Sequence, residues 1–371
     1  MKLYLNHSPL EFYFAKNHKN FIVEEIPLYE FSNKGEHIIF KIRKKNISTI
    51  EMIEKIAKAM NIKKGDIGYA GLKDKHALAM QYISINKNLT RRIESIIESI
   101  NNIENIKILD STHHNNKLKI GHLKGNKFFI RLKKLNKTNA FKLKNICALL
   151  QNQGFPNYFG YQRFGINGNN YKEGRAILEG KLKIKDRKKS LFLISAYQSY
   201  LFNKWLENRV ELSKIINEFS PALASRHLNL DLEYVKALKT QNHFFKILKG
   251  DVMSHYPYGK LFYFDGDFSR FSNKLISPTG LLQGVNTLRA RDIAGIFEDK
   301  YRDDLLEINK INGDRRFAWI FPFNLDFKYK EEVAHGELNF TLPKGSYATT
   351  LLEVLSNRKM DNKIEVNDDI R

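Results

Sequence analysis

The chain has 371 residues with 42% hydrophobic and 12% aromatic content, which predicts two or three folded domains and excludes a disordered protein. Its single cysteine, Cys147, excludes a disulfide framework and a cysteine-based zinc site, and the absence of a long apolar run or signal-peptide core predicts a cytoplasmic protein without a membrane span. The net charge of +22 favours a polyanionic partner, although a Lys-, Asn- and Ile-rich composition could also arise from an AT-rich genome.

The first part of the chain is predicted to alternate between helices and strands. Ser48 and Glu51 have the spacing of a capping box, and the apolar stripe that follows them predicts a helix over 48–60. Gly65 is expected to end this helix or the turn after it. The other elements expected here are strands at 36–42, 81–85 and 127–132 and a helix at 89–100. Together they predict a mixed α and β class.

The middle of the chain differs in composition from both ends. Residues 152–170 are rich in Gly, Asn and aromatics and are predicted to form an ordered loop, followed by a helix over about 190–209. Turns recur every few residues over 250–284, and a strand at 337–342 and a helix at 347–355 are expected near the end. This order indicates one domain inserted into another.

The segment 68–77 is the first that could carry chemistry. It is predicted to be a loop between a helix and a strand, where catalytic residues tend to lie. Asp74 has Lys73, Lys75 and His76 as neighbours, and their positive charge would favour the ionised carboxylate that a nucleophile requires. A solvated charged turn would have the same residues, so the segment alone leaves both interpretations open.

The segment 123–128 places an amide beside an aromatic ring. Asn126 precedes the predicted strand, where it could bind a base edge or close a turn, and Phe128 could stack on a base or belong to the core.

The segment 154–165 contains five aromatic residues, three glycines and Arg163. Aromatics interleaved with arginine suit single-stranded RNA, although an aromatic-anchored structural loop fits equally well.

Searches for cofactor motifs find no Walker A loop, no G-x-G-x-x-G and no H-E-x-x-H. His113 and His114 have no cysteine or carboxylate at ligand spacing. We therefore expect neither a cofactor nor a metal.

Taken together, these segments resemble the TruD family of tRNA pseudouridine synthases. The matching motifs, in order, are FIVEE at 21–25, GEH at 35–37, AGLKDKHA at 70–77, KGNKF at 124–128, PNYFG at 156–160, QRFG at 162–165, QSYLFN at 198–203, PTG at 278–280 and LPKGSYAT at 342–349. This colinear set is far more specific than any one of its members, and it covers almost the whole chain.

The resemblance implies an α+β fold with a pseudouridine-synthase catalytic domain, whose mixed, mainly antiparallel sheet is flanked by helices, and an inserted α/β TRUD domain. The expected boundaries are 1–154 with 310–371 for the catalytic domain and 155–309 for the insertion. The implied activity is isomerisation of uridine to pseudouridine in tRNA, at position 13, without a cofactor. tRNA is the expected partner, and we expect a monomer with no obligate protein partner.

The family's catalytic aspartate corresponds to Asp74, and the resemblance assigns substrate contacts to the residues that match its other motifs: Phe21, Lys73, Asn126 and Phe128. Further RNA contacts are expected from Lys16, Lys75, His76 and Arg163.

Two positions depart from the family pattern. The lysine usual six residues before Phe21 is replaced by Ala15, with Lys16 following, and an Arg-Glu pair near the C-terminus is replaced by Glu353 and Val354.

Two other classes share some of these features. A non-catalytic RNA-binding protein would have the charge and the aromatics but no need of the Asp74 loop. An RNA methyltransferase would need a methyl-donor site, for which the sequence has no glycine-rich turn of the common type.

Overall fold

A computed structural model describes residues 4–89, 92–165 and 167–360. Its contacts divide the chain into two compact units, each assembled from separate stretches of sequence. The first contains described residues from 4–10, 149–321 and 345–360, and the second contains described residues from 11–148 and 322–344. The segment 155–309 lies entirely in the first unit together with residues on both sides of it. The domain boundaries expected from the sequence stay a prediction.

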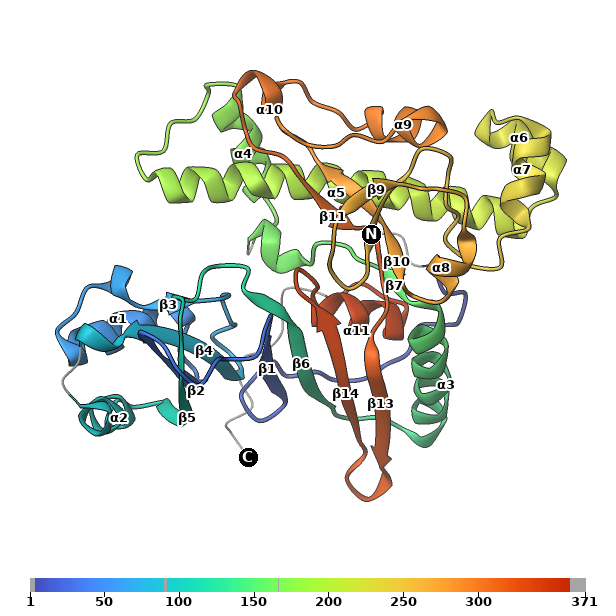
Figure 1. Cartoon of the computed structure of the whole chain (residues 1–371). Helices are drawn as coiled ribbons and strands as arrows, with labels where there is room; N and C mark the ends of the chain where they lie inside the picture. Colours follow the sequence, from blue (N-terminus) through green and yellow to red (C-terminus); the bar gives the residue numbers. More distant parts are fainter. Residues whose placement is uncertain (1–3, 90–91, 166, 361–371) are drawn as a thin grey trace. The chain divides into compact units, whose positions relative to one another are not determined.

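In the described part of the second unit, eight strands form one sheet. They are β1 (Phe21–Pro27), β2 (His37–Lys45), β3 (Gly68–Tyr69), β4 (Leu78–Asn86), β5 (Ile106–His114), β6 (Leu123–Leu132), β13 (Phe323–Lys330) and β14 (His335–Pro343). Their order is β13-β14-β6-β1-β4-β2-β5, with β3 paired to β4 (Figure 1). β1 and β4 run parallel and the other pairs are antiparallel. The prediction of a mixed, mainly antiparallel sheet is confirmed.

The central strand β1 has the alternation of a half-buried strand. Phe21, Val23 and Glu25 are buried, whereas Ile22 and Glu24 are more exposed. Because successive side chains of a strand point to opposite faces, a carboxylate shares the buried face with two apolar residues. A buried carboxylate requires a partner, and this requirement bears directly on the site described below.

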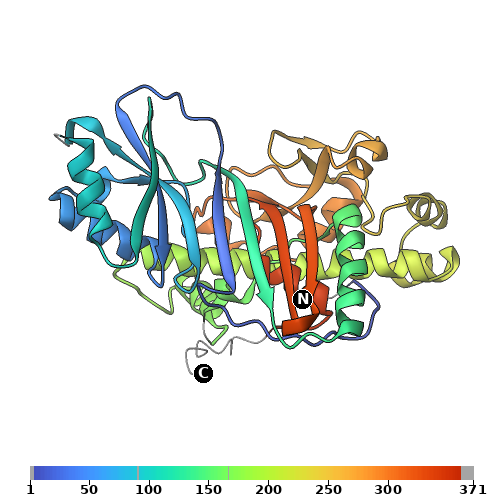
Figure 2. The same ribbon diagram turned by 90° about the horizontal axis from the view of Figure 1, so that it is seen from below.

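Two helices cover one end of this sheet, α1 (Thr49–Met60) and α2 (Ile93–Asn101). Figure 2 shows both helices at this end of the sheet. Their apolar faces join buried residues of β2, β4 and β5 in an isoleucine-rich core. Ser48 and Glu51 form the capping box that their spacing predicts. The helix ends at Asn61, which adopts the left-handed conformation with φ of 53°, and Gly65 lies inside the following turn, Lys64–Asp66. The expectation that Gly65 ends the helix or the turn after it is therefore wrong. Asparagine serves here because it tolerates this conformation better than most residues.

The first unit is built around the long helix α5 (Arg187–Glu218), which begins at the N-cap Asp186. Helix α3 (Lys137–Gln153) begins in the second unit and ends in the first. The remaining α-helices lie in the first unit and are α4 (Asn170–Leu178), α6 (Pro221–Leu228), α7 (Leu232–Lys239), α8 (Phe268–Ser272), α9 (Asp292–Asp299), α10 (Leu305–Ile308) and α11 (Ala348–Ser356). A four-stranded sheet has the order β11-β10-β8-β9, and β12 pairs with β7. These strands are β7 (Phe155–Pro156), β8 (Val252–His255), β9 (Leu261–Tyr263), β10 (Ile276–Leu282), β11 (Asp314–Phe317) and β12 (Trp319–Ile320). Short 3-10 helices are η1 (Lys64–Asp66), η2 (Lys87–Leu89), η3 (Tyr161–Phe164) and η4 (Glu331–Val333).

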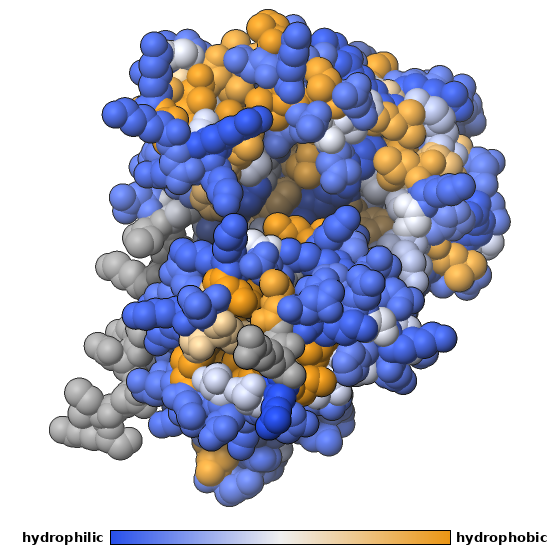
Figure 3. Space-filling view, turned by 60° about the vertical axis from the view of Figure 1, so that its left-hand side comes forward, coloured by the Kyte–Doolittle hydropathy of each residue, from blue (hydrophilic) through white to orange (hydrophobic). Residues whose placement is uncertain are grey.

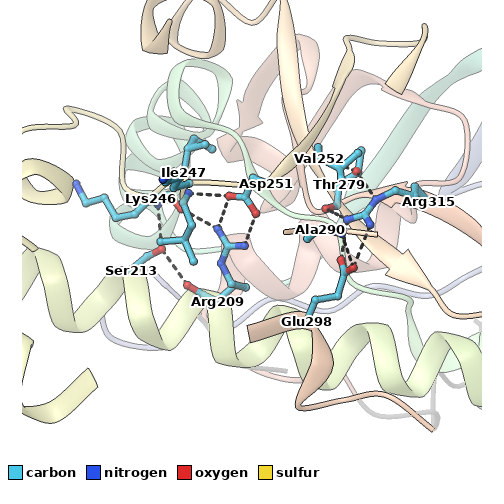
Figure 4. A network of polar contacts seen from close by, with 12 residues as sticks. Arg209, Ser213, Lys246, Ile247, Asp251, Val252, Thr279, Ala290, Glu298 and Arg315 are labelled. Atoms are coloured by element: carbon cyan, nitrogen blue, oxygen red, sulfur yellow. Dashed lines mark hydrogen bonds and ion pairs between the residues drawn. The ribbon is translucent and has the colours of Figure 1, made fainter. Parts of the chain in front are cut away.

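Two buried ion pairs lie inside the first unit. Arg209 of α5 binds the carboxylate of Asp251 with both terminal nitrogens, at 2.7 and 2.8 Å, and Arg315 binds Glu298 at 2.8 Å (Figure 4). Both arginine side chains are almost fully excluded from solvent. Each of these two guanidinium groups therefore has a carboxylate that balances its charge.

No helix in the described part of the chain is long and apolar enough to cross a membrane. Hydrophilic side chains cover much of the face in Figure 3, interrupted by separate apolar patches. Such a surface is usual for a folded protein in water.

Candidate active site

Asp74 lies on a loop between β3 and β4 whose two ends are buried. Ala70 and Ala77 are buried at 2% and 0% exposure, whereas the side chain of Asp74 is 46% exposed. Leu72, earlier in the loop, is 67% exposed. The loop thus presents one carboxylate to solvent from a rigid support.

The buried Lys44 of β2 holds the backbone of this loop. Its ammonium donates to the carbonyl oxygens of Ile47, Lys73 and Asp74 at 2.6, 3.3 and 2.7 Å. Burial lowers the pKa of Lys44 to about 8, and the Asp74 charge opposes this shift. Thr49 adds a second tie, because its hydroxyl accepts from the Lys73 amide at 2.9 Å. The position of Asp74 is therefore set by groups outside its own loop.

The carboxylate itself is paired with Lys16. The Lys16 ammonium lies 2.9 Å from Oδ1 of Asp74, and the two side chains are 12% and 46% exposed. The same ammonium lies 5.5 Å from the centre of the Phe21 ring. Lys16 thus connects the carboxylate to the aromatic residues of the central strands through one charged group.

Lys73 points into the protein. Its ammonium forms an ion pair with Glu25, and the two side chains are only 5% and 1% exposed. The other Glu25 oxygen accepts from the Tyr82 amide at 3.3 Å. This pair supplies the partner that the buried carboxylate of β1 requires, and it ties the Asp74 loop to that strand.

Three phenylalanines form a stack across β1, β6 and β14. Phe128 lies between Phe21 and Phe340, with ring centres 6.1 and 5.2 Å apart and interplanar angles of 7° and 24°. Phe21 and Phe128 are 3% and 6% exposed. The stack therefore belongs to the core. Phe21, at one end of the stack, is the ring that lies near the Lys16 ammonium.

Asn126 follows a glycine that the sheet requires. A Cβ on Gly125 would lie 2.3 Å from the Leu342 carbonyl oxygen, so only glycine fits between these strands. The side-chain oxygen of Asn126 is buried and has no hydrogen-bond partner among the described residues. A buried acceptor without a partner is rare, so this oxygen is available to a donor from a ligand.

Of the remaining predicted site residues, Lys75 and His76 adjoin Asp74 in its loop. Lys75 reaches Glu51 at 3.5 Å, with both side chains about half exposed, and His76 is exposed. Arg163 belongs to the first unit, so it is not among the residues gathered around Asp74 within the second.

Sequence reasoning did not find Lys44 and Thr49, and it assigned no role to Glu25. Lys44 stands between Arg43 and Lys45, a run that looks like an exposed basic face. Glu25 carried a signal, because strand alternation after Phe21 and Val23 predicts that it faces the core.

No three His, Cys, Asp or Glu side chains within the described ranges are grouped so that they could hold a metal ion.

Comparison with known proteins gives matches that agree with one another, and the relatives cover nearly the whole chain. Residues 1–185 match the family model of tRNA pseudouridine synthase D (TruD). A tRNA pseudouridine synthase D from Wolinella succinogenes is 48% identical over 361 residues, which are 96% of this chain and 98% of that protein. A protein of the same name from Sulfurimonas denitrificans is 46% identical over 359 residues, again 96% and 98% of the two chains.

A solved structure agrees in fold. A chain from Methanosarcina mazei, provisionally named tRNA pseudouridine synthase D, superposes with a TM-score of 0.65 at 20% identity. The match covers 98% of this chain and 97% of that one.

Proposed function

Because the chain belongs to the tRNA pseudouridine synthase D family, we propose that it isomerises uridine to pseudouridine in tRNA, at position 13. Family membership confirms the resemblance seen in the sequence. The reaction breaks the bond between N1 of uracil and C1′ of ribose, turns the base and joins C5 to C1′, while C5 loses a proton and N1 takes one up. Atoms balance without an oxidant or a second substrate, so the proposal includes no cofactor. It places the enzyme in the cytoplasm, acting as a monomer.

The observation that carries the proposal for the site is the half-exposed carboxylate of Asp74 on a loop whose other contacts are buried. A preorganised charged group needs little rearrangement when substrate binds. Asp74 acts on the sugar or on the base, as nucleophile or proton acceptor. Attack at the base and elimination through a sugar intermediate both require the same ionised carboxylate.

The neighbouring side chains have separate roles in this proposal. Lys16 holds the carboxylate by its ion pair. Lys73 acts as a positioning residue through Glu25. Phe21 and Phe128 form the apolar support against which the base lies, and the free oxygen of Asn126 accepts a hydrogen bond from the base edge.

RNA binding must offset the cost of extruding the uridine, about a few kcal/mol. The exposed Lys75 and His76 adjoin Asp74 in sequence, and they would meet the RNA backbone beside the extruded nucleotide.

The test is release of tritium from unmodified tRNA transcripts labelled at C5 of uridine, without added cofactor. Wild type should release tritium, and Asp74→Asn should bind the transcript and release none. Asp110→Asn is the matched control, since Asp110 is an exposed aspartate of β5 in the same unit. Release by rigorously purified Asp74→Asn would remove the aspartate from the mechanism. An inactive wild type that binds every tRNA tightly would overturn the proposed reaction.

A further inference from the structure

Four arginines of the first unit, three of them buried and one partly buried, differ in whether a carboxylate balances their charge. Arg209 and Arg315 each have a carboxylate at 2.7–2.8 Å, as Figure 4 shows. Arg163 and Arg316 have none within 4.0 Å among the residues that the structure describes. We call these two residues the arginine pair.

Arg316 of β11 is held entirely by neutral acceptors. Its guanidinium donates to the carbonyl oxygens of Asn157, Tyr158 and Gly345 and to the side-chain oxygen of Asn157. The residue is 9% exposed. These bonds occupy four of the five N–H groups and fix the orientation of the guanidinium, but they leave its charge unbalanced.

Arg163 of η3 uses fewer of its N–H groups in hydrogen bonds than Arg316 does. Its Nε and one terminal nitrogen donate to the hydroxyl oxygens of Ser199 and Ser195 at 3.2 and 2.5 Å. Its other terminal nitrogen has no hydrogen-bond partner within the described ranges. Arg163 therefore retains donors for a further acceptor, in an orientation that the two serines set.

The two charges share one aromatic ring. Arg316 lies 3.9 Å and Arg163 5.8 Å from the centre of Phe159. Burial, with a smaller contribution from the Arg163 charge, lowers the pKa of Arg316 to about 10. Burial also lowers the pKa of Arg163. Arg316 also lies 5.6 Å from the centre of the Phe202 ring and 5.8 Å from that of Tyr347. Cation–π contacts compensate only part of the cost of two partly desolvated like charges.

A second feature adjoins Arg316. The carbonyl of Gly345 accepts from its guanidinium, and the hydroxyl oxygen of the next residue, Ser346, is buried with no hydrogen-bond partner among the described residues. The segment beside Arg316 therefore has an unused polar group as well as an unbalanced charge.

We propose that the arginine pair is a binding subsite for a phosphodiester group of the RNA substrate, with Arg163 as the donor and Arg316 as the fixed charge behind it. A phosphate would supply the negative charge that no carboxylate of the protein provides to the arginine pair. Its oxygens match the planar arrangement of donors on the guanidinium. Phe159 and Phe192, over which Arg163 also lies at 5.2 Å, offer apolar surface beside the phosphate for the attached nucleoside. This inference rests on the proposed function, since it takes tRNA as the ligand.

The test is the affinity for a tRNA transcript, measured by fluorescence anisotropy over a series of salt concentrations. Arg163→Gln should bind about tenfold more weakly at low salt. The slope of log affinity against log salt should become shallower by about one. Arg163→Lys should keep the slope and lose part of the affinity, because it keeps the charge without the fork.

Arg175→Gln is the matched control. Arg175 lies on α4 of the same unit but pairs with Glu179 at 3.0 Å, so its charge is already balanced and its loss should leave the slope unchanged. An unchanged slope in Arg163→Gln, or an equal change in Arg175→Gln, would overturn the subsite. If Arg163→Gln does not fold, Arg163→Lys decides the matter: weaker binding at an unchanged salt slope supports the subsite, and wild-type affinity would overturn it.

A second experiment measures binding of inorganic phosphate by its effect on thermal unfolding. At matched ionic strength, phosphate should raise the unfolding temperature of wild type more than chloride does, and Arg163→Gln should show no such difference. A phosphate effect without any effect of Arg163→Gln on tRNA binding would assign the pair to free phosphate and overturn the RNA subsite. Tritium release by the same wild-type preparation keeps this failure separate from failure of the proposed function.

Discussion

Lys16 stands one residue beyond the position at which the family pattern has its lysine. Ala15, at that position, is 1% exposed, whereas the Lys16 ammonium reaches Asp74 at 2.9 Å. A short side chain is buried here, and the charge comes from the next residue. The departure in sequence therefore leaves a lysine within hydrogen-bond distance of the carboxylate.

We expect Lys16→Met to lower kcat about ten- to a hundredfold, because a charge-assisted hydrogen bond contributes about 1.5–3 kcal/mol. Tritium release at saturating tRNA measures this change. Lys41→Met is the control: Lys41 also pairs with a carboxylate, Glu24 at 2.6 Å, and lies 5.9 Å from the centre of the Tyr82 ring. A kcat for Lys16→Met equal to that of Lys41→Met would show that the pair with Asp74 has no part in turnover.

Glu353 of α11, one of the two residues that replace the family's Arg-Glu pair, is a buried carboxyl without a cationic partner at salt-bridge distance in the described part of the chain. It is 8% exposed, and its Oε1 accepts from the Met360 amide at 3.0 Å. Burial raises its pKa from 4.5 to about 6. Between pH 4.5 and 6 the folded state binds more protons at this residue than the unfolded state. Its contribution to stability is therefore present below pH 4.5 and is lost as pH rises through 6.

Glu353→Gln should remove this pH dependence and raise the free energy of unfolding at pH 7 by up to about 2 kcal/mol. The amide keeps the oxygen that accepts from Met360 and has no charge to desolvate. Urea unfolding at pH 4.5 and at pH 7 measures both effects. Glu173→Gln, an exposed residue of α4, should change neither. A variant less stable than wild type at pH 7 would contradict this account.

At the scale of elements, the ion pair between Glu25 and Lys73 joins strand β1 to the loop that presents Asp74. Removing one partner leaves the other charge buried, which costs about 3–5 kcal/mol. We expect Glu25→Leu and Lys73→Met each to lower the free energy of unfolding by this amount. The double variant should lose less than the sum, although it leaves the Tyr82 amide unpaired.

Urea unfolding of the four proteins in this cycle measures the coupling. The exposed pair of Lys64 and Glu54 is the control, and its coupling should be below about 1 kcal/mol. If the losses in the free energy of unfolding of the two single variants add exactly in the double variant, the Glu25–Lys73 pair does not hold the loop to β1. Turnover should fall in both single variants if the loop position matters, even where they remain folded.

Elements with strong local signals were predicted correctly from the sequence. The helix after Ser48 was identified because its capping box and apolar stripe agree. The helix predicted at 190–209 extends over Arg187–Glu218, since Asp186 caps it earlier and packing continues beyond Arg209. Strand β5 and helix α3 were missed, because the first is mostly exposed and the second has a weak apolar stripe. The loop expected at 152–170 includes β7 and η3, which its glycines and aromatics concealed.

At the scale of the whole molecule, the site illustrates which information a sequence contains. Asp74, Phe21 and Phe128 belong to recognisable motifs, and the second unit brings Asp74 and Phe21 together through Lys16. The tie from Lys44 spans 30 residues and that from Glu25 spans 48, so no local pattern indicates either. Long-range partners of this kind depend on strand order, which the sequence alone does not determine.

The net charge of +22 has two explanations, RNA binding and a biased composition, and salt dependence separates them. If the basic surface binds the tRNA backbone through about 6–10 phosphates, affinity should fall by about 10³- to 10⁵-fold between about 50 and about 200 mM salt. Fluorescence anisotropy with an unmodified transcript measures the slope. Asp74→Asn should give the same slope as wild type, because backbone contacts do not involve the reacting carboxylate. A loss below about tenfold would mean that most of the lysines reflect composition, and that tRNA is selected by shape and base contacts instead.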